Sequence, residues 1–169
     1  MSHTDPARIE QIRANLQAAR ARIEAACAKA DRDPAEVSLI AVTKTHPAAD
    51  VRILSSLGVT DVGENRDQEA APKAAQTADL DLTWHFVGQL QTNKAKSVAS
   101  YADVVHSVDR AKLARALGDR AAAAGRRLTC LVQVDLDEGS RAGVLGPRGG
   151  ADPADAPGIA DRIAEHEAL

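Results

Sequence analysis

The chain has 169 residues, of which 44% are hydrophobic and 27% charged, and its formal net charge is −3. These values predict one globular domain or part of one, and the slight acidity gives no reason to expect a nucleic-acid partner. No stretch approaches the roughly 20 apolar residues of a membrane span, and no apolar run follows the N-terminal residues as a signal peptide would require. We therefore expect a cytoplasmic protein without a membrane partner.

The first predicted element is a long helix over residues 6–30. Apolar side chains recur there at steps of three and four, as on one face of a helix, and Pro6 suits the first helical position. Asp31–Pro34 then ends the helix. A helix that precedes every strand has to pack on elements formed later in the chain.

Five short apolar runs follow, separated by helical patterns. Because the runs are short and three are rich in β-branched residues, they predict strands at 37–43, 59–63, 83–87, 104–108 and 128–136. Helices are expected at 47–57, 65–77, 91–100, 110–124 and 154–168. Residues 137–157 are rich in Gly, Pro and Asp, which predicts a long exposed loop.

The alternation of strands and helices indicates a parallel sheet, which is either doubly wound or closed into a barrel. No Gly-x-Gly-x-x-Gly pattern follows the first strand, where a dinucleotide-binding fold would have it. A TIM-type (β/α)₈ barrel is therefore favoured, although such barrels take about 250 residues. We expect residues 1–169 to form a single α/β domain containing the N-terminal helix and about the first five βα units.

Lys44 is the most informative residue at the carboxyl ends of these strands, where parallel α/β proteins bind ligands. It ends an apolar strand and shares a face with Ile40 and Val42. We expect partial burial there, which would lower the pKa of the amine and make it a nucleophile toward an aldehyde. The alternatives are a lysine that extends to the rim or one that pairs with Glu64.

Two histidines, His85 and His106, lie on adjacent predicted strands. Each is either a general acid or hydrogen-bond donor to a bound ring, or a core histidine bonded to the backbone. Glu64 and Asn65 follow the second strand and could equally cap a helix. The histidines come from scattered strands without the spacing of zinc ligands, so no metal site is predicted.

Five blocks in succession resemble those of the pyridoxal phosphate homeostasis protein family: Ile40–Pro47, Val62–Glu69, Trp84–Lys94, Val105–Asp109 and Leu131–Asp135. The resemblance runs from about residue 7 to the last residue. It implies a barrel similar to that of alanine racemase, the so-called fold type III. It further implies that Lys44 forms the Schiff base (an aldimine) with pyridoxal 5′-phosphate (PLP), and that Asn65, His85 and Ser107 line the pocket.

Members of the family are regarded as vitamin B6 carriers or regulators, which implies intracellular B6 homeostasis without turnover and leaves no residue assigned as catalytic. The alternative is a PLP-dependent enzyme similar to an amino-acid racemase, with His85 as its acid–base group. Family members continue for three more strands that hold the cofactor phosphate. We therefore expect a barrel truncated at its C-terminal end, with an open edge, a half-covered apolar face and weak cofactor retention. A complete barrel is expected to be a monomer.

Overall fold

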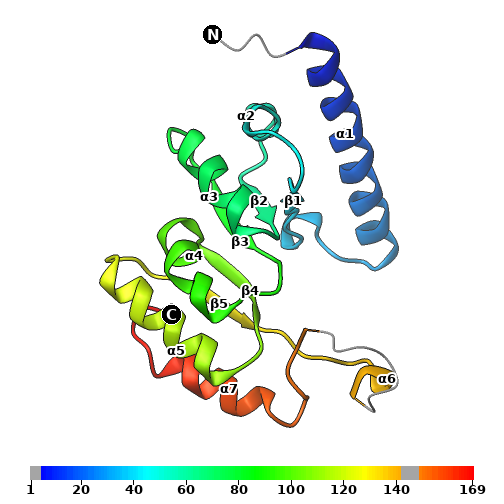
Figure 1. Cartoon of the computed structure of the whole chain (residues 1–169). Coiled ribbons are helices and arrows are strands. Elements are labelled where there is room, and N and C mark those ends of the chain that lie inside the picture. Colours follow the sequence, from blue (N-terminus) through cyan, green and yellow to red (C-terminus); the bar gives the residue numbers. More distant parts are fainter. Residues whose placement is uncertain (1–4, 142–148) are drawn as a thin grey trace.

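The computed structural model describes residues 5–141 and 149–169. Five parallel strands form one sheet in the order β1-β2-β3-β4-β5. The strands are β1 (Ala41–Val42), β2 (Asp61–Glu64), β3 (Thr83–Phe86), β4 (Val104–Val108) and β5 (Thr129–Val132). The α-helices are α1 (Pro6–Lys29), α2 (Ala48–Ser56), α3 (Asp67–Gln76), α4 (Ala95–Tyr101), α5 (Ala111–Ala123), α6 (Glu138–Arg141) and α7 (Ala156–Ala164) (Figure 1).

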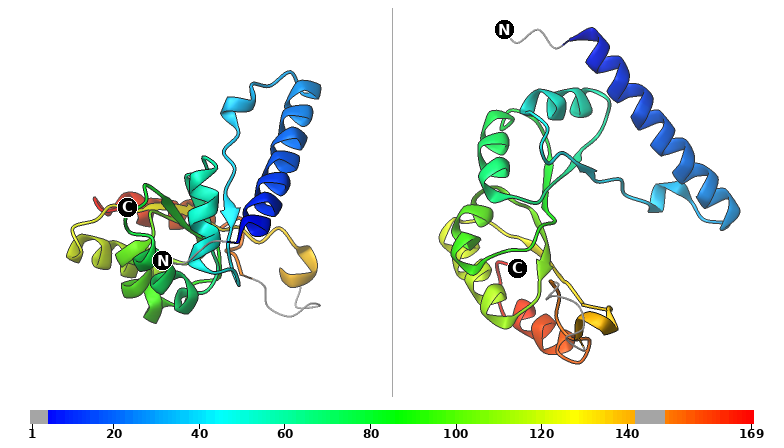
Figure 2. Two further views of the ribbon diagram at one scale, coloured as in Figure 1. Left: turned by 90° about the horizontal axis from the view of Figure 1, so that it is seen from above. Right: turned by 45° about the vertical axis from the view of Figure 1, so that its right-hand side comes forward.

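Helices α2 to α5 lie along one side of the curved sheet, and each joins two neighbouring parallel strands (Figures 1 and 2). This is the βα pattern of a barrel that extends around part of its circumference. The predicted α/β class and the five βα units are confirmed. We call the side away from these helices the concave face.

The predicted strand ends agree best in the middle of the sheet. β4 covers residues 104–108 as expected, since it has a partner strand on each side. β1 is much shorter than the predicted 37–43, because residues before Ala41 have no ladder partner among the described residues and β1 pairs only with β2. An apolar run predicts extended chain, but a ladder also requires a neighbour.

Two clusters of buried side chains lie between the sheet and its helices. The larger one joins β3, β4 and β5 to α4, α5 and α7, and includes the fully buried Leu113, Leu117 and Val105. The smaller one joins α1, α2 and α3 to β2 and the start of β3, around Val62 and Trp84. With few aromatic residues in the chain, aliphatic packing supplies most of this burial.

Helix α1 stands beside the β1 end of the sheet (Figure 2). Asp5 caps it by accepting a hydrogen bond from the Ala7 backbone N–H, and Leu16 is buried in the smaller cluster. Its Arg8 side chain forms an ion pair with Asp50 in the first turn of α2. The N-terminal helix therefore packs on elements formed later in the chain, as predicted.

The concave face leaves large apolar side chains in contact with solvent. Val42 is 48% exposed and Leu131 is 45% exposed, on the two edge strands. The expected half-covered apolar face is therefore confirmed. In the described part of the chain, no helix is both long and apolar enough to cross a membrane.

The prediction of one exposed loop over residues 137–157 is wrong in two places. Residues 138–141 form α6, and Ala151 is buried and makes a parallel bridge to Val134 just beyond β5. The bridge satisfies backbone groups on both sides of it, through hydrogen bonds from Ala151 N to Gln133 O and from Asp135 N to Ala151 O, each of 2.8 Å. Residues 142–148 of the predicted loop lie outside the described residues.

Candidate functional site

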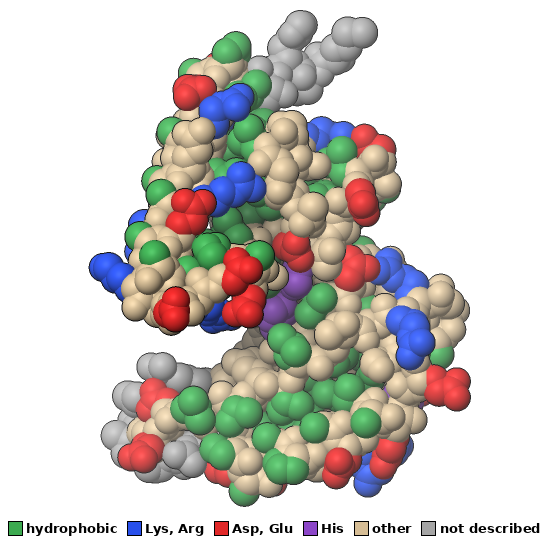
Figure 3. All heavy atoms as spheres, turned by 180° about the vertical axis from the view of Figure 1, so that it is seen from behind, with side chains coloured by type: hydrophobic (Ala, Val, Ile, Leu, Met, Phe, Trp, Pro, Cys, Tyr) green, Lys and Arg blue, Asp and Glu red, His purple; other side chains and the backbone are tan. Residues whose placement is uncertain are grey.

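A hollow on the concave face contains histidine side chains, with acidic groups on one side and hydrophobic groups on the other (Figure 3). The register of the ladder explains which residues share this face. Val42 pairs with Gly63, and Gly63 pairs with His85, so these three positions form one layer across β1, β2 and β3. Gly63 contributes no side chain, and methyl groups of Ile40 and Val42 cover it, each 3.2 Å from where a Cβ would stand.

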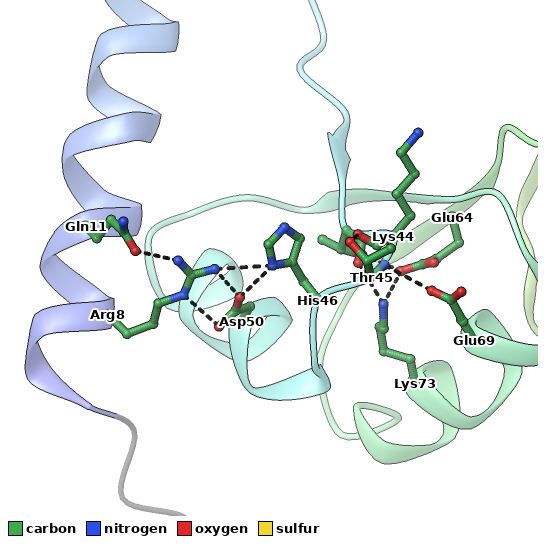
Figure 4. Close-up of polar contacts among 10 residues, drawn as sticks. Arg8, Gln11, Lys44, Thr45, His46, Asp50, Glu64, Glu69 and Lys73 are labelled. Carbon is green, nitrogen blue, oxygen red and sulfur yellow. Dashed lines mark hydrogen bonds and ion pairs between the residues drawn. The ribbon is translucent and has the colours of Figure 1, made fainter.

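Lys44 follows Val42 by two residues, in the turn after β1. Its side chain is directed away from the polar groups that hold its neighbours (Figure 4). The expectation of a partly buried lysine is wrong, because Lys44 is exposed. Periodicity predicts the face on which Lys44 lies, but burial on that face depends on what covers it, and no described residue buries the Lys44 side chain.

The alternative pairing of Lys44 with Glu64 is also wrong, because a different lysine occupies that position. Lys73 in α3 forms the ion pair with Glu64, and both side chains are buried, with exposed fractions of 7% and 0%. Thr43 Oγ1 donates a 2.7 Å hydrogen bond to the same Glu64 oxygen. Lys44 Nζ has no hydrogen bond or ion pair within the described part of the chain, so its amine is sterically and chemically accessible.

Three polar side chains form a diagonal chain of hydrogen bonds from β2 to β4. Asp61 Oδ1 lies 3.0 Å from His85 Nε2, and His85 Nδ1 lies 2.9 Å from His106 Nε2. Both ring nitrogens of His85 are therefore occupied. Sequence reasoning treated the two histidines separately and missed Asp61, whose position two residues before Gly63 on the same face was the available signal.

The charge of Asp61 determines the direction of these hydrogen bonds. The Thr60 hydroxyl, and then His85, hold the pKa of Asp61 below its ordinary value, so the carboxylate is ionised and only accepts. With neutral rings, His85 donates from Nε2 and accepts at Nδ1, and His106 donates from Nε2. Burial, followed by the effect of His85, lowers the pKa of His106. This leaves His106 Nδ1 as the unprotonated nitrogen at the end of the chain.

Two of the predicted site residues have a polar atom that is buried without a hydrogen-bond partner in the described structure, Asn65 Oδ1 and Ser107 Oγ. Glu64 Oε2 and the Tyr101 hydroxyl share this property. Asn65 follows Gly63 by two residues, just as Lys44 follows Val42, so both lie beyond the paired ends of neighbouring strands. A buried unpaired acceptor costs free energy, which a ligand or a bound water can recover. Lys44, Asn65 and His85 thus lie at or near the carboxyl ends of β1, β2 and β3. That Ser107 lines the same pocket stays a prediction.

The fold and this arrangement define a class: a parallel α/β barrel domain with an accessible lysine just after its first strand. The chain belongs to the family of the alanine racemase N-terminal domain, whose model matches residues 10–169.

Two bacterial relatives are similar to this chain in sequence. The chain is 42% identical over 153 residues to the pyridoxal phosphate homeostasis protein of Pseudomonas aeruginosa, covering 90% of this chain and 64% of the relative. It is 45% identical over 124 residues to the protein of the same name from Corynebacterium glutamicum, covering 69% of this chain and 55% of the relative. The chain thus spans less than two thirds of the length of these relatives.

Solved structures agree with this placement. PipY of Synechococcus elongatus with PLP bound is 38% identical with a TM-score of 0.69, covering 86% of this chain and 65% of PipY. A protein of unknown function from Bifidobacterium adolescentis gives a TM-score of 0.84 at 30% identity, covering 98% of this chain and 68% of that protein. Alanine racemase from Streptomyces coelicolor, at 20% identity and a TM-score of 0.68 over 95% of this chain and 40% of its own, shares the fold.

Proposed function

We propose that this chain binds PLP through a Schiff base on Lys44 and contributes to vitamin B6 homeostasis. The observation that carries the proposal is an exposed lysine, without a partner in the described structure, at the carboxyl end of the first barrel strand. PLP supplies an aldehyde, and a free primary amine is the side chain that condenses with it. The relatives named for PLP homeostasis, and the PipY structure with PLP bound, support the choice of cofactor.

The remaining polar atoms near the strand ends fit a pyridoxal ring. Asn65 Oδ1 is a buried acceptor without a partner in the described structure, suited to a hydroxyl or protonated nitrogen of a ligand. Asn65 would orient the ring from β2, and His85 would border it on the concave face without donating or accepting further, since both of its nitrogens are occupied. Ser107 would contribute its unpaired hydroxyl.

The direct test is reduction of the PLP complex with borohydride, followed by mapping of the labelled peptide. We expect the label on Lys44 in the unaltered chain. Lys44→Ala should lose it, whereas the matched control Lys112→Ala, which removes another exposed lysine from α5, should keep it. Label on another lysine, or none on the unaltered chain, contradicts the assignment.

A racemase-like activity has less support from the geometry. It requires a second acid–base group on the opposite face of the cofactor, and His85 is the candidate for this role. Its two nitrogens are hydrogen bonded to Asp61 and His106. We therefore expect no exchange of an amino acid's α-proton in deuterated water above that given by free PLP. Faster exchange that disappears in Lys44→Ala would favour an enzyme.

A further inference from the structure

The segment Thr43–Thr45, which carries Lys44, is held from below by helix α3 (Figure 4). Four hydrogen bonds connect its backbone or side chains to β2 and α3, and none of them involves the Lys44 amine. Thr43 N–H donates to Gly63 O at 2.8 Å, which continues the β1–β2 ladder. Of the other three, one leads to Glu64 at the end of β2, and two lead to Glu69 and Lys73 within α3.

Lys73 acts on the residue before Lys44. Its Nζ donates a 2.8 Å hydrogen bond to the Thr43 carbonyl and forms the buried ion pair with Glu64. Glu64 in turn accepts from Thr43 Oγ1 at 2.7 Å. The carbonyl and the hydroxyl of Thr43 are therefore both bound to one buried pair of charges, which restricts rotation of the peptide that leads into Lys44.

Glu69 acts on the residue after Lys44. Its Oε2 accepts a 3.0 Å hydrogen bond from the Thr45 backbone N–H, and this bond is the main reason that the pKa of Glu69 lies below its ordinary value. Thr45 has a φ of 66°, in the left-handed region that β-branched residues avoid. A charge-assisted hydrogen bond to its amide compensates for that unfavourable conformation.

We propose that Glu69 and the buried Lys73–Glu64 pair are positioning residues for Lys44. They hold the peptides on both sides of Lys44, so that its side chain leaves the backbone toward the concave face and its amine stays unbound. The proposal rests on PLP binding by Lys44. In this proposal the amine of Lys73, which also lies close to this segment, binds the Thr43 carbonyl and does not react with the cofactor.

Glu69 offers the cleanest test, because its side chain is 32% exposed and its removal leaves no buried charge. We expect Glu69→Ala to weaken PLP binding about tenfold, measured from the visible absorbance of the Schiff base, because it removes a hydrogen bond to a charged group. Glu69→Gln keeps an acceptor for the Thr45 N–H and should stay within about threefold of the unaltered chain. Arg66→Ala is the matched control, since Arg66 is the other partner of Glu69.

Amide hydrogen exchange provides a readout that requires no cofactor. Glu69→Ala should speed exchange at Thr45 about tenfold, while exchange in β4 stays unchanged, because only the local hydrogen bond is lost. Thr45→Gly in the Glu69→Ala background should recover part of the PLP binding, since glycine adopts a positive φ without strain. Unchanged binding and exchange in Glu69→Ala would overturn the proposal, and so would equal losses in Glu69→Ala and Glu69→Gln.

The buried pair needs a neutral replacement, because one charge left alone in the core could unfold the chain. The double variant Glu64→Gln/Lys73→Met keeps the volumes and removes both charges. We expect it to fold and to bind PLP more weakly, with any label still on Lys44. Unchanged PLP binding in this variant would remove the pair from the proposal. If the unaltered chain takes no label at Lys44, the proposed function fails, and exchange at Thr45 alone then decides whether the segment is held as described.

Discussion

Gly88, directly beyond β3, makes the closest backbone approach near the candidate site, and Gly88→Ala tests that packing. A Cβ placed on Gly88 would lie 2.7 Å from both the carbonyl carbon and the Cα of Asn65, and closer still to its carbonyl oxygen. These are backbone atoms at the end of β2, which cannot rotate away as a side chain could. The sequence Trp84–Lys94 therefore requires glycine at this position for steric reasons.

The size of the effect follows from the overlap. Non-bonded carbon atoms normally approach to about 3.5 Å, so the two chain segments must separate by at least about 0.8 Å to accept a methyl group, and the closer carbonyl oxygen requires more. Overpacking of this kind typically costs 1–3 kcal/mol, and a backbone neighbour places Gly88→Ala near the upper limit, at about 3 kcal/mol. The same displacement moves Asn65, so PLP binding should fall together with stability.

Urea denaturation followed by circular dichroism measures the change in the free energy of unfolding. Gly158→Ala is the matched control, because Gly158 lies in α7 with no atom within 4 Å of an added Cβ. Alanine there should stabilise the chain by up to about 1 kcal/mol, since alanine favours helix over glycine. A Gly88→Ala chain within about 0.5 kcal/mol of the unaltered chain would refute this account of the β2–β3 contact.

Two further predictions concern titration. Nitrogen NMR should find His106 with an unprotonated Nδ1 at neutral pH and a pKa below the usual value of about 6.5, because burial and His85 both disfavour its charge; a pKa at or above that value would contradict the Asp61–His85–His106 chain. The Arg8 hydrogen bond lowers the pKa of Asp50, so its stabilisation is complete above the unfolded value of about 3.9 and is lost as the pH falls through the folded value. Asp50→Asn should therefore show a smaller acid dependence of urea stability, and an unchanged dependence would refute the role of this ion pair.

The order of the strands and helices could be predicted because the spacing of apolar residues within each βα unit is a local property of the sequence. Val104–Val108 is rich in β-branched residues and lies between two neighbours, so local preference and pairing agree there. At the β1 edge of the sheet, local preference and pairing disagree. The run 37–40 predicts a strand, but β1 pairs only with β2 and begins at Ala41. Ala151 was missed for the same reason, since its bridge to Val134 depends on a distant partner and not on its own Gly- and Pro-rich surroundings.

The sequence predicts the position of Lys44 just after the first strand, which the structure has, but it does not predict the environment of this residue. Strand alternation predicts the face on which Lys44 lies, but its exposure depends on whatever covers that face. The buried lysine could have been found from helix periodicity, because Lys73 shares the buried side of α3 with Ala70, Ala74 and Thr77 at helical spacing. The positive charge of Lys73 makes burial unfavourable, so the sequence alone provides no reason to place it in the core. The ion pair with Glu64, which the fold brings close, offsets that cost.

Lys44 and Lys73, the two lysines near the end of β1, differ in whether their amines form an ion pair. Lys73 neutralises Glu64 inside the core, so a reaction that took its ammonium group away from this position would leave a carboxylate buried without a cation, at a cost of about 3–5 kcal/mol. The Lys44 amine forms no ion pair within the described structure, and a reaction at this amine leaves the hydrogen bonds of Thr43 and Thr45 in place. The proposed selectivity of PLP for Lys44 over Lys73 therefore has two physical reasons, charge pairing and access. Denaturants that open α3 should make Lys73 reactive only as the chain unfolds.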